Sequence, residues 1–103
     1  MSTLIVLFNL KAGSDAQSYE EWAKATDLPI VRQLKSVDRF DVFRTQGLFG
    51  TDAPAPYQYV EIIDISDLDG FGQEVASDTM RRVAGEFQAI ADNPVFMLTE
   101  KFS

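Results

Sequence analysis

The first apolar segment of the chain runs almost without interruption from Thr3 to Leu10, as TLIVLFNL. A strand with one face in water alternates apolar and polar residues, whereas a strand that is covered on both faces does not. We therefore expect a strand here whose two faces are both covered.

A kinked helix is predicted after this strand. Ser14-Asp15-Ala16-Gln17 has the pattern of a capping box, which opens a helix. Because Pro29 supplies no N–H and its ring crowds the carbonyl of Ala25, we expect a kink near Asp27-Leu28. An apolar stripe at helical spacing runs through this region. Its members are Tyr19, Trp22, Ala23, Thr26, Ile30 and Leu34.

Two strands joined by a long connection follow. The first covers Arg39 to Gln46 and places Phe40, Val42 and Arg44 on one face. The connection, residues 47–56, is rich in Gly and Pro. The second strand covers Tyr57 to Ile65. The residues that share one of its faces are Tyr57, Tyr59, Glu61, Ile63 and Ile65.

The last third of the chain predicts two helical pieces and a strand. Ser66-Asp67-Leu68-Asp69 has a second capping pattern and starts a short helix. We expect Leu68, Phe71 and Val75 to point inward from it. A break at Ser77-Asp78 precedes a longer helix, which ends at Asp92-Asn93-Pro94, and residues 95–102 form the last strand. The stripe of the longer helix consists of Met80, Val83, Ala84, Phe87 and Ile90.

The predicted order of elements is β-α-β-β-α-β over residues 1–103, which form one domain. This order is typical of a ferredoxin-like α+β fold, an antiparallel four-stranded sheet with both helices on one face. The continuous apolar first strand still requires cover on the other face. A second copy packed sheet to sheet would provide it, so we expect a homodimer of the dimeric α+β barrel kind.

The charge and the first segment limit the partners and the location. The chain has nine Lys and Arg against sixteen Asp and Glu, a net charge of −7. Such an acidic surface repels phosphate backbones and anionic membranes, so we expect neither nucleic acid nor membrane as a partner. The first apolar segment is short, has no basic residues before it and lacks a small-residue cleavage site. We therefore expect a cytoplasmic protein without a signal peptide or a membrane span.

The inventory of residue types excludes several kinds of chemistry. The chain has no cysteine and no histidine, which removes thiol nucleophiles, histidine bases and the usual soft metal ligands. No nucleotide-binding fingerprint is present, and the acidic stretch from Asp64 to Gly70 lacks carboxylates at the first and last ligand positions of a calcium loop. We expect chemistry without cofactor or metal, carried by carboxylates, Tyr, Lys, Arg or the substrate itself.

Three candidate residues lie on the strand that ends at Ile65. Tyr57, Tyr59 and Glu61 share a face, and Arg44 lies on the neighbouring strand. An Arg and a Glu on paired strands usually form a cross-strand ion pair. Alternatively, a partly buried Glu61 has a raised pKa and acts as an acid or base, with Tyr59 donating a hydrogen bond to a substrate oxygen. The sequence leaves open which sheet face these side chains occupy.

The first helix and strand hold four further candidates. Tyr19 and Trp22 are expected either in the core or beside a gap between helix and sheet where a flat aromatic ligand stacks. Asp27 lies at the kink, where it caps the helix, is a solvated charge, or moves a proton. Asn9 is the one polar residue in the apolar run, and its buried amide must be hydrogen-bonded to backbone or to a ligand.

Four long segments of the chain resemble the RedY-like (HapK) family, and the resemblance covers nearly the whole chain. They are IVLFNLKAGSD, YEEWAKATDLPIV, GTDAPAPYQYVEI and FQAIADNPVFMLTEKF. The family resembles dimeric α+β barrel proteins in fold, and it is associated with bacterial pathways to prodiginine pigments and related pyrrole or indole compounds. The resemblance implies a small tailoring or cyclisation protein that acts on an aromatic intermediate. It supplies no catalytic motif.

Two classes of function follow from these observations. The first is a cofactor-independent biosynthetic enzyme in which Glu61, Asp27 and Tyr59 are catalytic; a cofactorless monooxygenase is a variant of it. In this hypothesis five residues contact the substrate: Asn9, Tyr19, Trp22, Arg44 and Tyr57. The second is a non-catalytic carrier or binding module, or a structural partner in a larger synthase, with no need for titratable groups. The fold does not choose between the classes.

Overall fold

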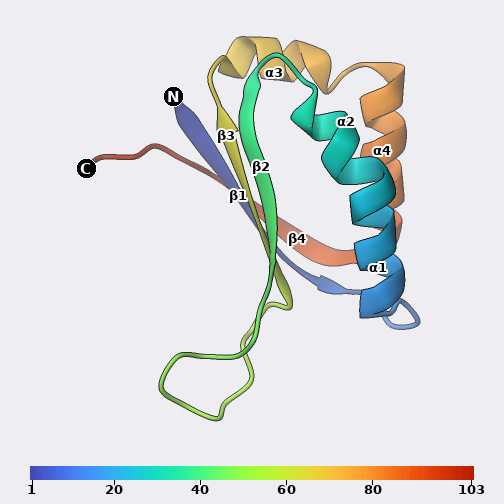
Figure 1. Ribbon diagram of the computed structural model, residues 1–103, viewed down its shortest axis with the longest axis vertical. Coiled ribbons are helices and arrows are strands. Elements are labelled where there is room, and N and C mark those ends of the chain that lie inside the picture. The colour runs from blue at the N-terminus through green and yellow to red at the C-terminus, as the bar shows by residue number, and fades with distance from the viewer.

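A four-stranded antiparallel sheet carries the helices on one of its faces in the computed structural model, which describes residues 1–103 (Figure 1). The strands lie side by side in the order β2-β3-β1-β4, and every neighbouring pair is antiparallel. Their bounds are Ser2–Leu10 for β1, Val37–Arg44 for β2, Tyr59–Ile65 for β3 and Ala91–Thr99 for β4. The predicted ferredoxin-like α+β order is confirmed.

The first helical segment has three parts: α1 (Ala16–Trp22), the π-helical turn η1 (Ala23–Asp27) and α2 (Leu28–Arg32). Its start is fixed by Asp15, whose carboxylate accepts the N–H of Ser18 at 2.8 Å. The predicted kink is confirmed, and it takes the form of a wide turn.

Proline explains why the turn is wide. In η1 the N–H of Leu28 donates to the carbonyl of Ala23, five residues back, instead of the usual four. Pro29 follows directly and occupies the start of α2, where an N–H is not required. The chain therefore remains helical across Pro29.

The second helical region consists of α3 (Leu68–Glu74) and α4 (Asp78–Ile90). Asp67 and Ser77 cap these helices through their side chains. The expectation that Leu68 points inward is wrong, since it is 44% exposed. A helical side chain covers the turn before it, and at the first helical position there is no such turn.

The bounds of three strands also differ from the expectation. The strand β2 begins at Val37 and ends at Arg44, two residues earlier at both ends than expected. The strand β3 begins at Tyr59, so Tyr57 belongs to the long β2–β3 connection. The strand β4 begins at Ala91, immediately after α4, because Asn93 adopts a positive φ of 45° and lets the chain turn within the strand. Asn is one of the few residues that tolerate this conformation.

The two faces of the sheet differ in their cover. Val6 and Phe8 of β1 and Glu61 of β3 point to the helices and are buried. The middle of the opposite face is apolar and not fully buried, and Figure 1 shows no helix on that side. Its partly buried residues include Ile5, Leu7, Val60 and Ile62, and its exposed ones include Phe43 and Met97. The middle of both faces is therefore apolar, as the first strand predicts. None of the helices has the length and apolar composition that a membrane crossing requires.

Candidate functional site

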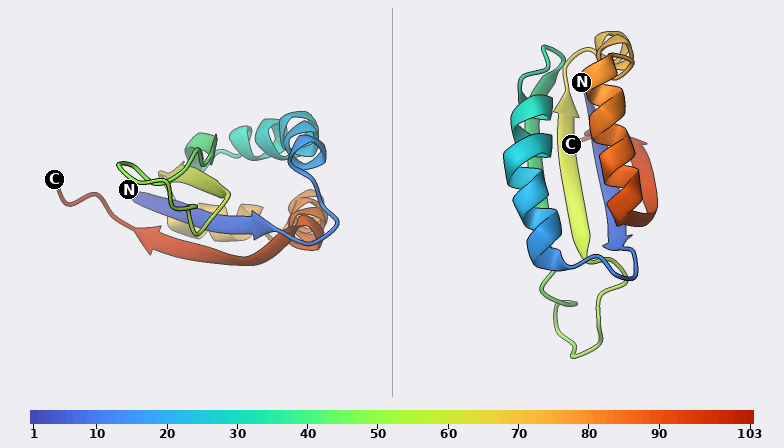
Figure 2. Two further views of the ribbon diagram at one scale, coloured as in Figure 1. Left: turned by 90° about the horizontal axis from the view of Figure 1, so that it is seen from below. Right: turned by 90° about the vertical axis from the view of Figure 1, so that its right-hand side faces the viewer.

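An apolar cavity of about 250 Å³ lies between the sheet and the helices. Its walls come from all four strands and from both helical regions, and twelve of its fourteen lining residues are hydrophobic. The α1–α2 segment and α4 flank the sheet strands at this level (Figure 2, right). The two exceptions to the apolar lining are both acids, Asp27 and Glu61. The apolar walls include Val31, Phe40, Ile63, Val83, Phe87 and Phe96.

Glu61 enters the cavity from the centre of the sheet. Strand register places it opposite Val6 of β1 and Val42 of β2, so its immediate neighbours across the sheet offer no partner. It is 5% exposed, and its Oε2 atom has no hydrogen-bond partner. Burial, followed by the nearby charge of Asp27, raises the pKa of Glu61 to about 8. At pH 7 this side chain is mostly a neutral acid.

Asp27 enters the cavity from the helical side, at the end of the wide turn η1. It continues the row of Tyr19 and Ala23, and each member of this row is four residues after the last. It is 6% exposed, and its side chain caps no backbone N–H, so the capping alternative and the solvated-charge alternative are both wrong. Burial raises the pKa of Asp27 to about 6, which leaves it mostly ionised at pH 7.

Tyr19 is the third buried polar side chain near these acids. Its hydroxyl has no hydrogen-bond partner, and its ring packs edge-on against Phe8 at 5.4 Å. Burial is the main cause that raises its pKa, and the charges of Glu61 and Asp27 are the next two. Since buried polar atoms in proteins are nearly always paired, two unpaired oxygens in one neighbourhood indicate a place where a bound molecule contributes polar groups.

Tyr59 and Arg44 form a separate group at the outer edge of α1. The Tyr59 hydroxyl donates to Glu20 Oε2 at 2.8 Å, and the Arg44 guanidinium donates to both oxygens of Glu20, at 2.7 and 2.5 Å. These hydrogen bonds, Arg44 first, lower the pKa of Glu20 to about 2. Burial and then the Glu20 hydrogen bond raise the pKa of Tyr59 to about 12.

The alternative of an ion pair between Arg44 and Glu61 is therefore wrong. Strand register places Arg44 opposite Tyr59, and Val42 opposite Glu61, so the guanidinium reaches α1 instead. The structure also engages the Tyr59 hydroxyl with Glu20, outside the cavity lining. Glu20 was not predicted as a site residue, although it directly follows Tyr19 on the first helix.

Trp22 and Asn9 hold other parts of the protein together. The indole N–H of Trp22 donates to Glu86 of α4 at 2.9 Å and so links the two helical regions. The Asn9 amide donates to the Pro56 carbonyl at 3.0 Å and accepts the Gln58 N–H at 2.9 Å. The backbone alternative for Asn9 is thus the one observed, and this residue fixes the end of the β2–β3 connection.

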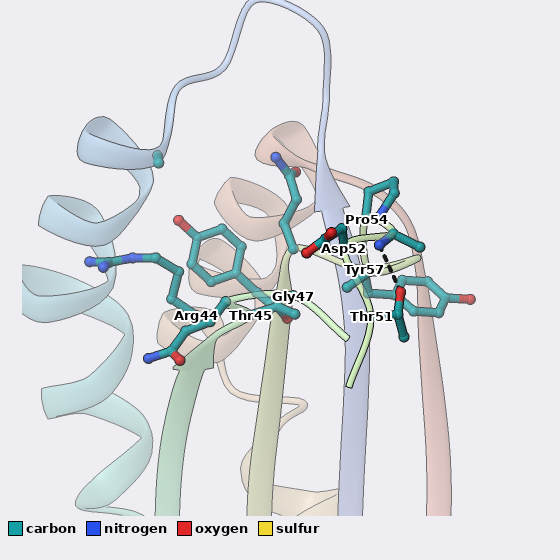
Figure 3. A pocket seen from close by; sticks show the side chains of 13 residues that line it. Arg44, Thr45, Gly47, Thr51, Asp52, Pro54 and Tyr57 are labelled. Carbon is teal, nitrogen blue, oxygen red and sulfur yellow. Dashed lines mark hydrogen bonds between the residues drawn. The ribbon is translucent and has the colours of Figure 1, made fainter. Parts of the chain in front are cut away.

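A larger hollow, about 580 Å³, lies at the base of the β2–β3 connection (Figure 3). Tyr57 lies there, well separated from Asp27 and Glu61 in the lining of the cavity. The charged residues that line the larger hollow, Arg44 and Asp52, are both exposed, and the Arg44 side chain extends toward α1. We consider the smaller cavity the candidate site because only it combines an apolar lining with buried acids.

The arrangement can provide an acid and a base in one apolar cavity. Environments that push the pKa values of two carboxyl groups apart assign them different roles. At neutral pH Asp27 is mostly ionised and is able to accept a proton, and Glu61 is mostly protonated and is able to donate one. Of the predicted set, the structure places only these two acids in the cavity lining. The residues outside the lining are Asn9, Tyr19, Trp22, Arg44, Tyr57 and Tyr59. Among them, Tyr19 has a pKa that burial and then the charges of the two acids raise. No group of three or more potential ligands is placed to hold a metal ion.

The fold and the cavity define a ferredoxin-like α+β protein whose apolar cavity contains two buried acids. The profile of the family described as REDY-like protein HapK matches residues 2–102, and the chain belongs to this family. No curated protein sequence matches the chain.

Solved structures agree with this assignment. HapK from Hahella chejuensis is 30% identical, with a TM-score of 0.79 over 100% of this chain and 94% of that one. An ethyl tert-butyl ether degradation (EthD) family protein from Bacillus halodurans is 18% identical, with a TM-score of 0.78 over 99% of both chains. SnoaB from Streptomyces nogalater, a cofactor-independent oxygenase, is 17% identical, with a TM-score of 0.76 over 99% of this chain and 93% of that one. The last two comparisons bear on the fold alone.

Proposed function

We propose that this protein is a cofactor-independent enzyme that transfers protons on a small, flat aromatic intermediate bound in the cavity. The observation that carries the proposal is the pair of buried carboxyl groups, Asp27 and Glu61, in an otherwise apolar lining. Burying two acids without a cation is costly, and such an arrangement is typical of sites where the acids act on a ligand.

The chemistry proposed for the pair is general acid–base catalysis. The ionised Asp27 removes a proton from a C–H or N–H group of the intermediate, and the neutral Glu61 gives its proton to another atom of the same molecule. Each turnover leaves Asp27 protonated and Glu61 ionised, and proton exchange with water restores both. A tautomerisation or a ring closure of the intermediate requires these two transfers and no added oxidant.

Family membership supports the choice of substrate. The chain belongs to the HapK family, and we propose a role in bacterial secondary metabolism, on a pathway to prodiginine pigments or related pyrrole or indole compounds, within the cytoplasm. A cavity of about 250 Å³ suits one or two aromatic rings, because an engineered cavity of ~150 Å³ already binds benzene.

Two alternatives use the same cavity. A carrier would need only the apolar lining, twelve residues of which could hold a ring without reaction. A cofactorless monooxygenase would use Asp27 to deprotonate a substrate that then reduces oxygen itself; a neighbour in fold, SnoaB, is a cofactor-independent oxygenase. Oxygen uptake during turnover distinguishes this variant from proton transfer alone.

The double variant Asp27→Asn/Glu61→Gln tests the enzyme against the carrier. Both changes keep the shape of the side chain and remove its ability to exchange protons, so the variant should lose turnover while it keeps affinity for an uncharged aromatic ligand. Product formation by chromatography and binding by calorimetry give the two quantities. Unchanged product formation in the variant would rule out the proton-transfer roles and favour the carrier.

We also propose that the apolar outer face of the sheet packs against a second copy of the chain. Ile5 and Ile62 are paired neighbours on that face, and no helix covers them. Sedimentation at micromolar concentration should give the mass of a dimer, and Ile62→Glu should shift it to that of a monomer because a carboxylate would be buried in the interface. A monomeric wild-type protein at that concentration contradicts this proposal.

A further inference from the structure

We infer that the cavity prefers an aromatic molecule that carries a protonated amine over the same ring with a neutral or an acidic group. The inference rests on the proposed function, namely that an aromatic molecule binds in this cavity. It adds the charge and the hydrogen-bonding type of that molecule.

Two buried carboxyl groups provide hydrogen-bond acceptors inside the cavity. Glu61 lines the cavity and is 5% exposed. Its Oε2 atom is buried and has no hydrogen-bond partner. Asp27 lines the same cavity from the opposite side and makes no capping hydrogen bond. The ionised Asp27 has acceptor oxygens only, and the neutral Glu61 keeps a carbonyl oxygen that accepts, so a ligand that satisfies these atoms must supply donors.

The lining of the cavity contains no cationic side chain. Neither Lys nor Arg is among the fourteen residues that line the cavity. Arg44 binds Glu20 through two hydrogen bonds. Lys24 is exposed, and its charge helps to lower the pKa of Glu20. The buried acids therefore have no positive partner of their own within the protein.

A ligand with an ammonium group meets both conditions. An ammonium carries three donors and one positive charge, and hydrogen bonds to ionised groups are about twice as strong as neutral ones. The aromatic walls, such as Phe40, Phe87 and Phe96, add favourable contacts for a ring and for a cation near a ring face. A carboxylate ligand would instead be a third acid in a cavity without a cation, which opposes its binding.

Three indoles that differ only in the end of the side chain test the inference. Tryptamine carries an ammonium at pH 7, tryptophol a hydroxyl and indole-3-acetate a carboxylate. By titration calorimetry at pH 7, we expect tryptamine to bind about tenfold tighter than tryptophol. We expect indole-3-acetate to bind the weakest of the three.

Variants assign the preference to the cavity. In Asp27→Asn/Glu61→Gln the advantage of tryptamine over tryptophol should disappear, while the affinity for tryptophol changes less than about threefold. If circular dichroism shows that the double variant is unfolded, the two single variants replace it. The control Asp69→Asn/Asp92→Asn removes two exposed carboxylates, and therefore at least as much negative charge at pH 7 as the cavity variant removes. It should keep the full preference for tryptamine.

The outcomes separate this inference from the proposed function. Equal binding of tryptamine and tryptophol, or an unchanged preference in the cavity variant, overturns the inference and leaves an aromatic ligand site in place. Loss of the preference in the surface control also overturns it, since the attraction would then come from the acidic surface. Failure of all three indoles to bind counts against both the inference and the proposed aromatic site.

Discussion

Turnover by the wild-type protein is expected to be highest between pH 6 and pH 8, and Glu61→Gln is expected to lower it by about 10²–10⁴-fold. Activity needs Asp27 ionised and Glu61 protonated, and burial raises their pKa values to about 6 and about 8. Turnover should therefore fall below pH 6 as Asp27 gains a proton and above pH 8 as Glu61 loses one. The two limbs of the profile belong to the coupled pair.

The measurement is the initial rate against pH with a pyrrole or indole intermediate that the protein converts. Glu61→Gln should remove the alkaline limb along with most of the rate, because glutamine has no proton to lose in this range. The matched control is Glu100→Gln, the same substitution at an exposed position near the end of the chain, which should keep the wild-type profile. An alkaline limb that persists in Glu61→Gln contradicts the assignment of Glu61 as the acid.

The free energy of unfolding should fall as pH rises from 5 to 8, and Glu61→Gln should remove about 3–4 kcal/mol of that fall. Burial raises the pKa of Glu61 from 4.5 to about 8 in the folded protein. Below pH 4.5 the side chain is protonated in both states, so its burial carries no charge penalty. Between pH 4.5 and pH 8 the unfolded chain ionises first, and stability is lost until the folded pKa is passed.

Urea unfolding at pH 5 and pH 8 measures this effect. The cost of burying the glutamine amide is the same at both pH values, so it cancels when the change between them is compared. The pKa of Asp27 is raised from 3.8 to about 6, so Asp27 also lowers the free energy of unfolding as pH rises, over a lower range of pH. Asp27 is present in both the wild type and Glu61→Gln, so its effect is common to the two. Glu100→Gln should behave as the wild type. Parallel pH dependences of the wild type and Glu61→Gln would show that Glu61 is not held neutral by the fold.

Much of the fold could be predicted from local patterns. The alternation from Tyr59 to Ile65 identified one face of β3. The capping patterns at residues 14–17 and 66–69 and the break at Ser77-Asp78 identified the helix starts, although the capping residues in the first two are Asp15 and Asp67. These signals depend on neighbouring residues only. The start of β4 was missed because Asn93 takes a left-handed conformation that allows the strand to begin before Pro94.

The candidate site was predictable only in part. The kink at Pro29 pointed to Asp27, and the row of Tyr19, Ala23 and Asp27 at four-residue spacing would have placed that acid on the buried face. The partner of Arg44 could not be found in this way, because it depends on strand register and on where α1 crosses the sheet. The apolar walls contributed by α4 and β4 likewise arise only when distant segments pack together.

The hydrogen bond between Trp22 and Glu86 has a practical consequence. Trp22 is the single tryptophan of the chain, and it joins α1 to α4, which lines the cavity; α1 itself continues through η1 and α2, which also line it. Its fluorescence spectrum is therefore an intrinsic optical probe of the spacing between these helices. Any molecule that wedges them apart would break the indole hydrogen bond and change the emission, with no label added to the protein.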